Sequence, residues 1–187
     1  MNPQWRQHLE ARGAQVVDGR VAHFGDAAGE LRAAPSGTLL ADLSHLGLLC
    51  VSGEDAESFL QGQQSCDVKK LGPKAAGYGS YCTAQGRMLA VFLLWAKDGA
   101  FCMQLPAEIL APIQKRLGMF VLRSKVKIEN ASDAWVRMGL AGPGAAALLA
   151  EAGLADPAHG GAETAMLPAG HSPAATVIAL GGSRFEL

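Results

Sequence analysis

Long apolar runs are missing from this sequence, and so is an excess of charge of either sign. No uninterrupted apolar stretch approaches the roughly 18 residues that a membrane-spanning helix needs. Residues 1–15 are polar and lack the apolar centre of a signal peptide. A formal net charge of -1 argues against broad electrostatic binding to nucleic acid. From these absences we expect a cytoplasmic protein that makes no direct contact with membranes or nucleic acid.

Metal-binding motifs are also missing. The four cysteines are widely spaced, and none belongs to a CxxC or CxH pattern, so we expect no structural zinc site. Cys50 and Cys102 stand in apolar segments and are expected in the core. Cys66 follows a polar run and is expected to be the most exposed thiol, whereas Cys82 precedes a turn and could line a cleft.

Apolar residues, by contrast, are plentiful. They make up 49% of the 187 residues, which is enough to build a core without disulfides or bound metal. We expect an N-terminal extension over residues 1–37, a first α+β unit over residues 38–133, and the start of a second α+β unit over residues 134–187. The predicted fold class is α+β, with mostly antiparallel sheets flanked by short helices.

The two ends of the chain carry turn signals. Asp18-Gly19 stands between short apolar segments and predicts a small hairpin over residues 16–24. Residues 25–37 are rich in Gly, Ala and Pro and predict a loop, as do residues 155–173. Near the C-terminal end, the Gly pair at 181–182 predicts a second hairpin.

The middle of the chain has the clearest pattern. Residues 88–96 form an almost continuous apolar run with Val, Phe and Trp, which predicts a central buried strand. A turn follows, and residues 101–105 are expected to pair back with that strand. A helix over residues 106–117 and a strand over residues 121–129 complete an antiparallel α+β unit.

Cap residues predict the ends of two helices. Ser52 is the expected N-cap of a short helix, with Asp55 as its capping-box partner. In the second helix, Pro112 predicts either a kink or a true start near Ala111. Gly118 is the expected C-terminal cap of that helix.

Several motifs carry a resemblance to a known family. Residues 46–68 read as strand, cap, helix and polar turn, and residues 78–94 read as strand, Gly turn and buried strand. Together with the Asp-Leu-Ser-His stretch at 42–45 and the Gly-Pro step at 142–143, they resemble the N-terminal folate-binding part of the aminomethyltransferase superfamily, which includes the glycine cleavage T-protein. Within it, they are most similar to the YgfZ-type folate-binding proteins. We expect His45 to be a core histidine bonded to backbone rather than a general base.

Two features of that family are absent. Family members continue into a C-terminal part with a Lys-Gly-Cys-Tyr-x-Gly-Gln-Glu motif, so we expect a natural truncation, a fragment or an incomplete chain. T-proteins also carry two adjacent Asp residues on the strand after the Gly turn, where this sequence has Ala90 and Val91. One-carbon transfer from folate needs such a carboxylate to stabilise an iminium-like intermediate. The resemblance therefore implies the fold without the activity, unless a carboxylate comes from elsewhere.

Ligand binding does not require those carboxylates. By resemblance, Tyr78 aligns with a T-protein tyrosine near the folate, Thr83 with an Asn before the Gly turn, and Gln104 near an Asn after the next strand. All three are candidate residues for binding tetrahydrofolate. Arg87 and Arg123 are the nearest cations for its glutamate tail. Two alternatives stay open: that Tyr78 only covers the core, and that Arg123 belongs to a solvated strand face. No residue is assigned a catalytic or metal-binding role.

Three functions follow from these observations. The first is a non-catalytic folate-binding accessory protein that supports iron–sulfur enzyme maintenance and tRNA modification, with iron–sulfur proteins or assembly factors as partners, as the resemblance implies. The second is a folate-dependent aminomethyltransferase-like enzyme. The third is a structural or interaction fragment without a ligand.

Overall fold

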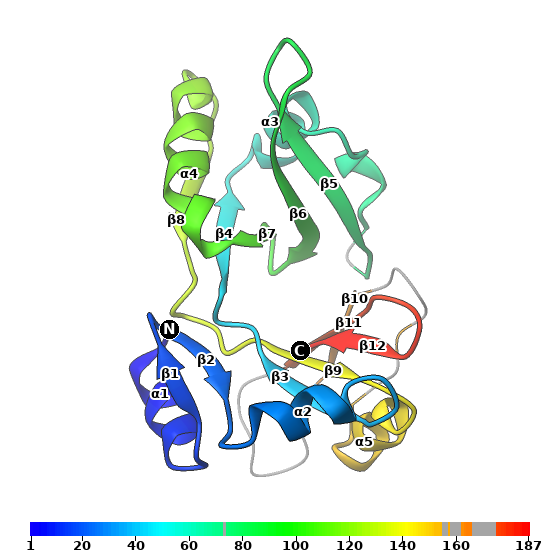
Figure 1. Cartoon of the computed structure of the whole chain (residues 1–187). Helices are drawn as coiled ribbons and strands as arrows, with labels where there is room; N and C mark the ends of the chain where they lie inside the picture. Colours follow the sequence, from blue (N-terminus) through cyan, green and yellow to red (C-terminus); the bar gives the residue numbers. More distant parts are fainter. Residues whose placement is uncertain (73, 155–156, 158–161, 166–174) are drawn as a thin grey trace. The chain divides into compact units, whose positions relative to one another are not determined.

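The computed structural model describes residues 1–72, 74–154, 157, 162–165 and 175–187 (Figure 1). The chain forms two compact units. Leu46–Ser132 makes one of them, and the flanking segments Met1–His45 and Asp133–Leu187 together make the other. Among the described residues, no helix is both long and apolar enough to cross a membrane.

The middle unit is built on one five-stranded antiparallel sheet with the order β5-β6-β7-β4-β8 (Figure 1). Its elements are β4 (Leu46–Ser52), α3 (Ala56–Gln63), η1 (Val68–Lys70), β5 (Ala76–Cys82), β6 (Met88–Lys97), β7 (Ala100–Pro106), α4 (Ala107–Val121) and β8 (Lys127–Asn130). Strand β6 pairs with β5 on one side and β7 on the other, so the predicted central strand is confirmed, as is the antiparallel α+β class.

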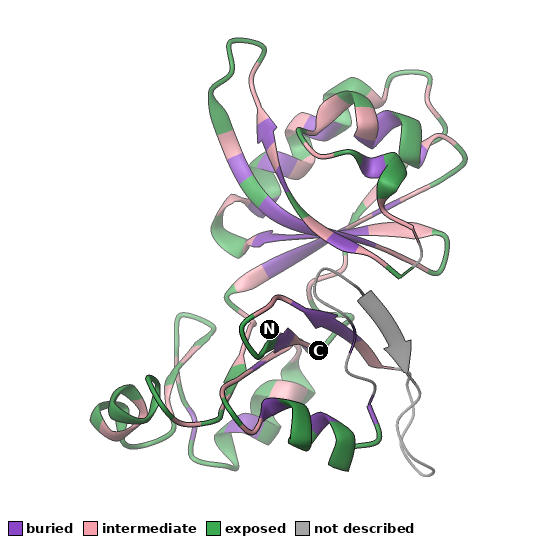
Figure 2. Cartoon of the chain, turned by 90° about the vertical axis from the view of Figure 1, so that its right-hand side faces the viewer, coloured by how far each residue is buried: buried purple, intermediate pink, exposed green. Residues whose placement is uncertain are grey.

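Alternation along the strands divides the sheet into two faces. Phe92 and Leu94 of β6 point to the same side as Met103 of β7, and α3 and α4 cover that side with their own apolar residues. Each helix buries one side, with Ala56, Phe59 and Leu60 in α3 and Leu110, Ile113 and Leu117 in α4. Figure 2 shows buried and exposed residues side by side on the helical ribbons of the chain. This helix-covered face holds the main core of the unit.

The two helix ends differ from the sequence-based expectations. Asp55, not Ser52, is the N-cap of α3, and its side chain makes no capping bond within the helix. Helix α4 begins at Ala107, runs through Pro112 and continues past Gly118 to Val121. The helix tolerates Pro112 because its apolar face, with Leu110, Ile113 and Leu117, is anchored on the core. The strand predicted from residue 121 is accordingly shorter.

The flanking unit contains a second five-stranded sheet with the order β10-β11-β12-β9-β3 and a separate two-stranded hairpin, β1-β2. Its elements are α1 (Pro3–Glu10), β1 (Gln15–Val17), β2 (Arg20–His23), α2 (Ala27–Ala33), β3 (Leu39–Asp42), β9 (Met138–Ala141), α5 (Ala145–Glu151), β10 (Ala162–Ala165), β11 (Ala175–Ala179) and β12 (Arg184–Glu186). Strand β3 pairs with β9 from the far end of the sequence. That pairing explains why the compact units do not follow the predicted division at residues 38 and 134.

Both predicted hairpins of this unit are confirmed, but two predicted loops are wrong in part. Asp18 and Gly19 turn the first hairpin with positive φ angles of 49° and 73°. Helix α2 occupies the first predicted loop, where the Asp26 carboxylate caps it by accepting from the Gly29 backbone N–H at 2.9 Å. Strand β10 lies in the second predicted loop, residues 155–173. Most of the remainder of that loop falls outside the described residues.

A close backbone contact fixes the loop between α4 and β8. The Lys125 backbone N–H donates to the Asp55 carboxylate at 2.7 Å, and the Lys125 ammonium donates to Glu54 at 2.7 Å. Gly53 makes this approach possible: its φ is 117°, and an added Cβ would overlap the Lys125 carbonyl oxygen. The turn at residues 53–55 therefore holds the loop at residues 122–126 in place. We call this contact the 53–125 clamp.

We expect Gly53→Ala to lower the free energy of unfolding by about 2–4 kcal/mol, because the methyl group meets a backbone oxygen and the φ angle is unfavourable for alanine. Urea denaturation measures the change. Gly62→Ala is the matched control. Gly62 lies in α3 with open space where alanine would place its methyl group, so this substitution should raise stability by about 0.5–1 kcal/mol. Equal losses in the two variants would contradict the clamp.

Candidate functional site

Two of the predicted ligand-binding residues lie in one row on the sheet face opposite the helices. Tyr78 pairs with Leu93, Leu93 with Gln104, and Gln104 with Leu48. Direct cross-strand partners share a face, so these four side chains point to the same side, with Tyr78 and Gln104 about 10 Å apart across two strand spacings. Leu93 and Gln104 are buried, whereas Tyr78 is 62% exposed. We call this face, with its row from Tyr78 to Leu48, the tyrosine face.

Thr83 and Arg87 form the turn that joins β5 to β6. The Thr83 backbone N–H donates to the Arg87 carbonyl at 2.8 Å, and the Arg87 backbone N–H donates to the Thr83 hydroxyl at 3.2 Å. The Arg87 side chain is exposed. Five residues of extended chain, or about 16 Å, separate Tyr78 from Thr83, so this turn lies at the end of the hairpin and not beside the Tyr78 row.

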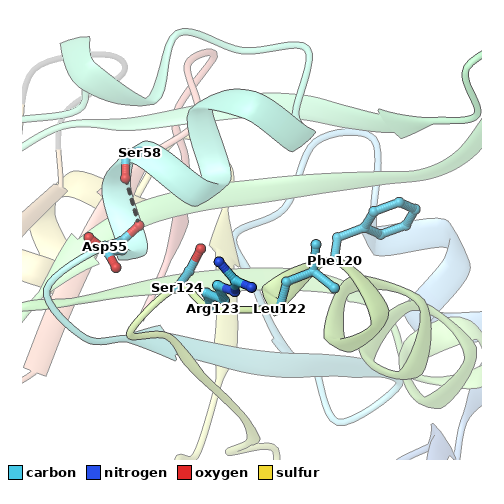
Figure 3. Close-up of a pocket in the computed structure, with 6 residues that line it drawn as sticks. All are labelled: Asp55, Ser58, Phe120, Leu122, Arg123 and Ser124. Carbon is cyan, nitrogen blue, oxygen red and sulfur yellow. Dashed lines mark hydrogen bonds between the residues drawn. The ribbon is translucent and has the colours of Figure 1, made fainter.

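Arg123 lies elsewhere, in the loop that follows α4. It lines an open hollow of about 790 Å³ together with five other residues, contributed by the start of α3, the end of α4 and the loop after it (Figure 3). These other residues are Asp55, Ser58, Phe120, Leu122 and Ser124. Since α3 and α4 cover the opposite side of the sheet, the structure does not bring Arg123 to the Tyr78 row. The five predicted residues occupy three separate places.

The two positions at which the resemblance places the T-protein acids hold hydrocarbon here, but only one of them is buried. Ala90 belongs to the core under the helices, whereas Val91 is 49% exposed on the tyrosine face. Strands β4, β5, β6 and β7 contain no Asp or Glu. The edge strand β8 contributes one acid to the tyrosine face, Glu129, which pairs with Cys50 across the strands and forms a 2.8 Å ion pair with Lys127.

Sequence reasoning missed Leu93 and Glu129 as members of this face. The alternation along residues 88–96 already implied that Leu93 points away from Phe92 and Leu94. Only the order of the strands adds that Leu93 lies between Tyr78 and Gln104, and that β8 is the edge strand carrying Glu129. No sequence pattern indicated the hollow beside Arg123.

The cysteines are free thiols with different surroundings. Cys102 is buried and lies directly opposite Cys50, and burial raises the pKa of Cys102 to about 12. Desolvation and then Glu129 raise the pKa of Cys50. Cys66, expected to be the most exposed thiol, is instead half-buried against the core beside Gly79, and burial raises its pKa as well. Cys82 is half-buried too.

The Asp-Leu-Ser-His stretch has a structural role in the flanking unit. The Asp42 carboxylate accepts from the Trp5 indole N–H at 2.8 Å and from the Ser44 hydroxyl at 2.8 Å, so it ties α1 to the end of β3. His45 is exposed, which corrects its prediction as a core histidine. Within the described residues, no group of three or more His, Cys, Asp or Glu side chains is placed to hold a metal ion.

We expect the stability of the chain to fall between about pH 9 and pH 12 because of Cys102. The unfolded thiol loses its proton near 9.0 and the folded one near 12, so the unfolded state binds fewer protons in this window and the free energy of unfolding decreases as pH rises. Cys102→Ala should therefore lose less stability than the wild type on going from about pH 8 to about pH 11, as urea denaturation would show.

Met103→Ala is the control for that experiment, because it empties a neighbouring core position without removing a titrating group. It should lower stability at both pH values while keeping the wild-type difference between them. An unchanged pH dependence in Cys102→Ala would mean that the buried thiol does not control alkaline unfolding.

Comparisons with known proteins agree with this architecture. Residues 4–163 match the family described as the GCVT N-terminal domain. The chain superposes on the aminomethyltransferase T of the glycine cleavage system from Bartonella henselae with a TM-score of 0.78 and 20% identity, covering 98% of this chain and 52% of that one. At this identity the likeness shows the fold alone.

Curated relatives are similar over part of their length. The tRNA-modifying protein YgfZ of Photobacterium profundum is 37% identical over 113 residues, which are 59% of this chain and 33% of the relative. An iron–sulfur cluster assembly factor IBA57 homolog, mitochondrial, from Cryptococcus neoformans is 34% identical over 99 residues, which are 51% of this chain and 26% of the relative. The chain thus spans a third or less of these relatives. It belongs to the GCVT N-terminal domain family of the T-protein superfamily, as its resemblance to YgfZ-type members predicted.

Proposed function

We propose that this chain is a cytoplasmic folate-binding accessory protein that supports iron–sulfur enzyme maintenance and tRNA modification and does not transfer aminomethyl groups. The observation that carries the proposal is the tyrosine face: an exposed aromatic ring and buried apolar side chains on strands that contain no Asp or Glu.

Folate binding is supported by the chemistry of that face. A pterin ring is flat, with polar atoms on its edge, and it needs an apolar surface with a few well-placed polar groups. Tyr78 supplies an exposed ring for stacking, and the buried Leu93 and Gln104 continue its row on the next two strands. In this proposal Arg87, beside Thr83 at the end of the hairpin, is the cation for the glutamate tail. Arg123 lies in the loop after α4, on the helix side of the sheet, and is proposed to serve a different surface.

The proposed absence of catalysis is supported by the surroundings of Glu129, the acid that β8 contributes to the tyrosine face. Transfer of an aminomethyl group needs a carboxylate free to act on the reacting nitrogen. Glu129 is on the edge strand β8, three strand spacings from β6, and forms an exposed ion pair with Lys127 at 2.8 Å, while Ala90 and Val91 carry no ionisable group.

The accessory role rests on the relatives. One is named a tRNA-modifying protein and another an iron–sulfur cluster assembly factor, and the matched segments are 33% and 26% of their lengths. We therefore propose the role for the whole protein, with iron–sulfur proteins or their assembly factors as partners, and assign to this chain the folate-binding step.

We expect tetrahydrofolate to bind the chain saturably, and Tyr78→Ala to weaken binding by about tenfold or more, because the stacking surface is lost. Isothermal titration under reducing, anaerobic conditions measures both affinities. Phe24→Ala is the matched control: Phe24 is an exposed aromatic residue of the other unit, and its removal should leave the affinity unchanged. Failure of tetrahydrofolate to saturate the wild type would favour an interaction fragment without a ligand.

A second assay separates this proposal from the enzyme. We expect no tetrahydrofolate-dependent release of ammonia from an aminomethyl donor, because the strands that carry the proposed pterin site have no Asp or Glu. A clear release of ammonia would overturn the non-catalytic proposal. Loss of that release in Glu129→Gln, with folate affinity retained, would then identify Glu129 as the missing acid.

A further inference from the structure

The end of α4 exposes three large apolar side chains within four residues. Met119 is 58% exposed, Phe120 43% and Leu122 86%. Phe120 and Leu122 also line the hollow that contains Arg123 (Figure 3). Clustered apolar residues around a hollow mark an interaction site more often than scattered ones do. We call Met119, Phe120, Leu122 and Arg123 the α4-end surface.

The backbone of Leu122 has a strained conformation. Its φ is 45° and its ψ is -105°, a region that non-glycine residues adopt only when their surroundings enforce it. The enforcing contacts come from the 53–125 clamp and from the Ser124 backbone N–H, which donates to the Val121 carbonyl at 2.8 Å. A bulky apolar side chain is thus held out of the core on a fixed loop, which lowers the entropy lost on binding a partner.

The surface carries cations from Arg123 and Arg116, and the hollow beside them is also lined by the Asp55 carboxylate. Arg123 makes no hydrogen bond or ion pair with any residue that the structure describes. The Arg116 guanidinium lies 6.0 Å from the centre of the Phe120 ring. Two nearby acids have partners of their own: Glu54 pairs with the Lys125 ammonium, and the Asp55 carboxylate accepts a hydrogen bond from the Lys125 backbone N–H and keeps its charge. A carboxylate from a partner would pair with Arg123 without displacing an existing ion pair.

We infer that the α4-end surface binds a segment of a partner protein in which an Asp or Glu stands close to a large apolar side chain. The carboxylate pairs with Arg123, and the apolar side chain enters the hollow against Phe120 and Leu122. This inference does not depend on the proposed folate site, which lies on the other side of the sheet.

The test is a selection of random displayed peptides against the full chain, followed by fluorescence anisotropy with synthetic copies of the selected sequences. We expect the selected peptides to carry Asp or Glu within about three residues of a Leu, Phe, Met or Trp. Their affinity should fall about tenfold or more in Leu122→Asp and in Arg123→Glu. Replacing the peptide acid by Lys should restore binding to Arg123→Glu. Saturating tetrahydrofolate should leave the affinity unchanged.

Two substitutions of the same type serve as controls. Arg87→Glu reverses an exposed arginine elsewhere, and Leu31→Asp changes a leucine that is 75% exposed. Neither should alter peptide binding. Leu122→Gly should raise the unfolding temperature, because glycine relieves the strained backbone, and should weaken binding at the same time. A lower unfolding temperature would show instead that Leu122 is needed for packing and overturn its role as a displayed anchor.

Other results would also overturn the inference. One is a selection that gives no enrichment above background or only peptides without an acidic residue. Another is displacement of the bound peptide by tetrahydrofolate. The last two are a wild-type dimer that Leu122→Asp dissociates, and binding to anionic lipid vesicles that Arg123→Glu abolishes. The last two outcomes would assign the surface to a second copy of the chain or to a membrane.

Discussion

The alternation of side chains along the buried strand β6 constrains every site in the middle unit. Phe92 and Leu94 face the helices and complete the core, so Val91 and Leu93 must face the other way. Because β6 pairs on both sides, this division extends to its neighbours and places Tyr78 and Gln104 on the same face as Leu93. A shift of one residue in the pairing would exchange the two faces and remove the Tyr78 row.

This division gives the unit two surfaces with different chemistry. The tyrosine face combines an aromatic ring, an amide and apolar side chains, its row from Tyr78 to Leu48 lies on strands without acids, and it supports the proposed folate site. The helix side ends in the strained Leu122 and the neighbouring Arg123, which support the proposed protein contact. Gly53 links the fold to this proposed contact, since only glycine allows the backbone approach that holds the loop.

Local patterns predicted much of this fold. The run at residues 88–96 and the Asp18-Gly19 turn were recognised because strand burial and hairpin turns depend on neighbouring residues. Features that depend on distant residues were not. Pro112 stays inside α4 because of core packing, β3 joins β9 from the far end of the sequence, and Arg123 lies on the helix side because α4 is longer than its glycine and proline suggested. The family resemblance gave the candidate residues, but only the strand order shows which of them lie together.

Mapping the ligand onto the sheet tests the central claim most directly. Backbone amide signals of the isotopically labelled full chain can be followed by NMR during addition of tetrahydrofolate. We expect the largest shifts in β5, β6 and β7 around Tyr78, Leu93 and Gln104, with the loop at residues 122–126 unaffected. Shifts confined to that loop, or saturable binding without any change in these strands, would contradict the assignment of the folate site to the tyrosine face.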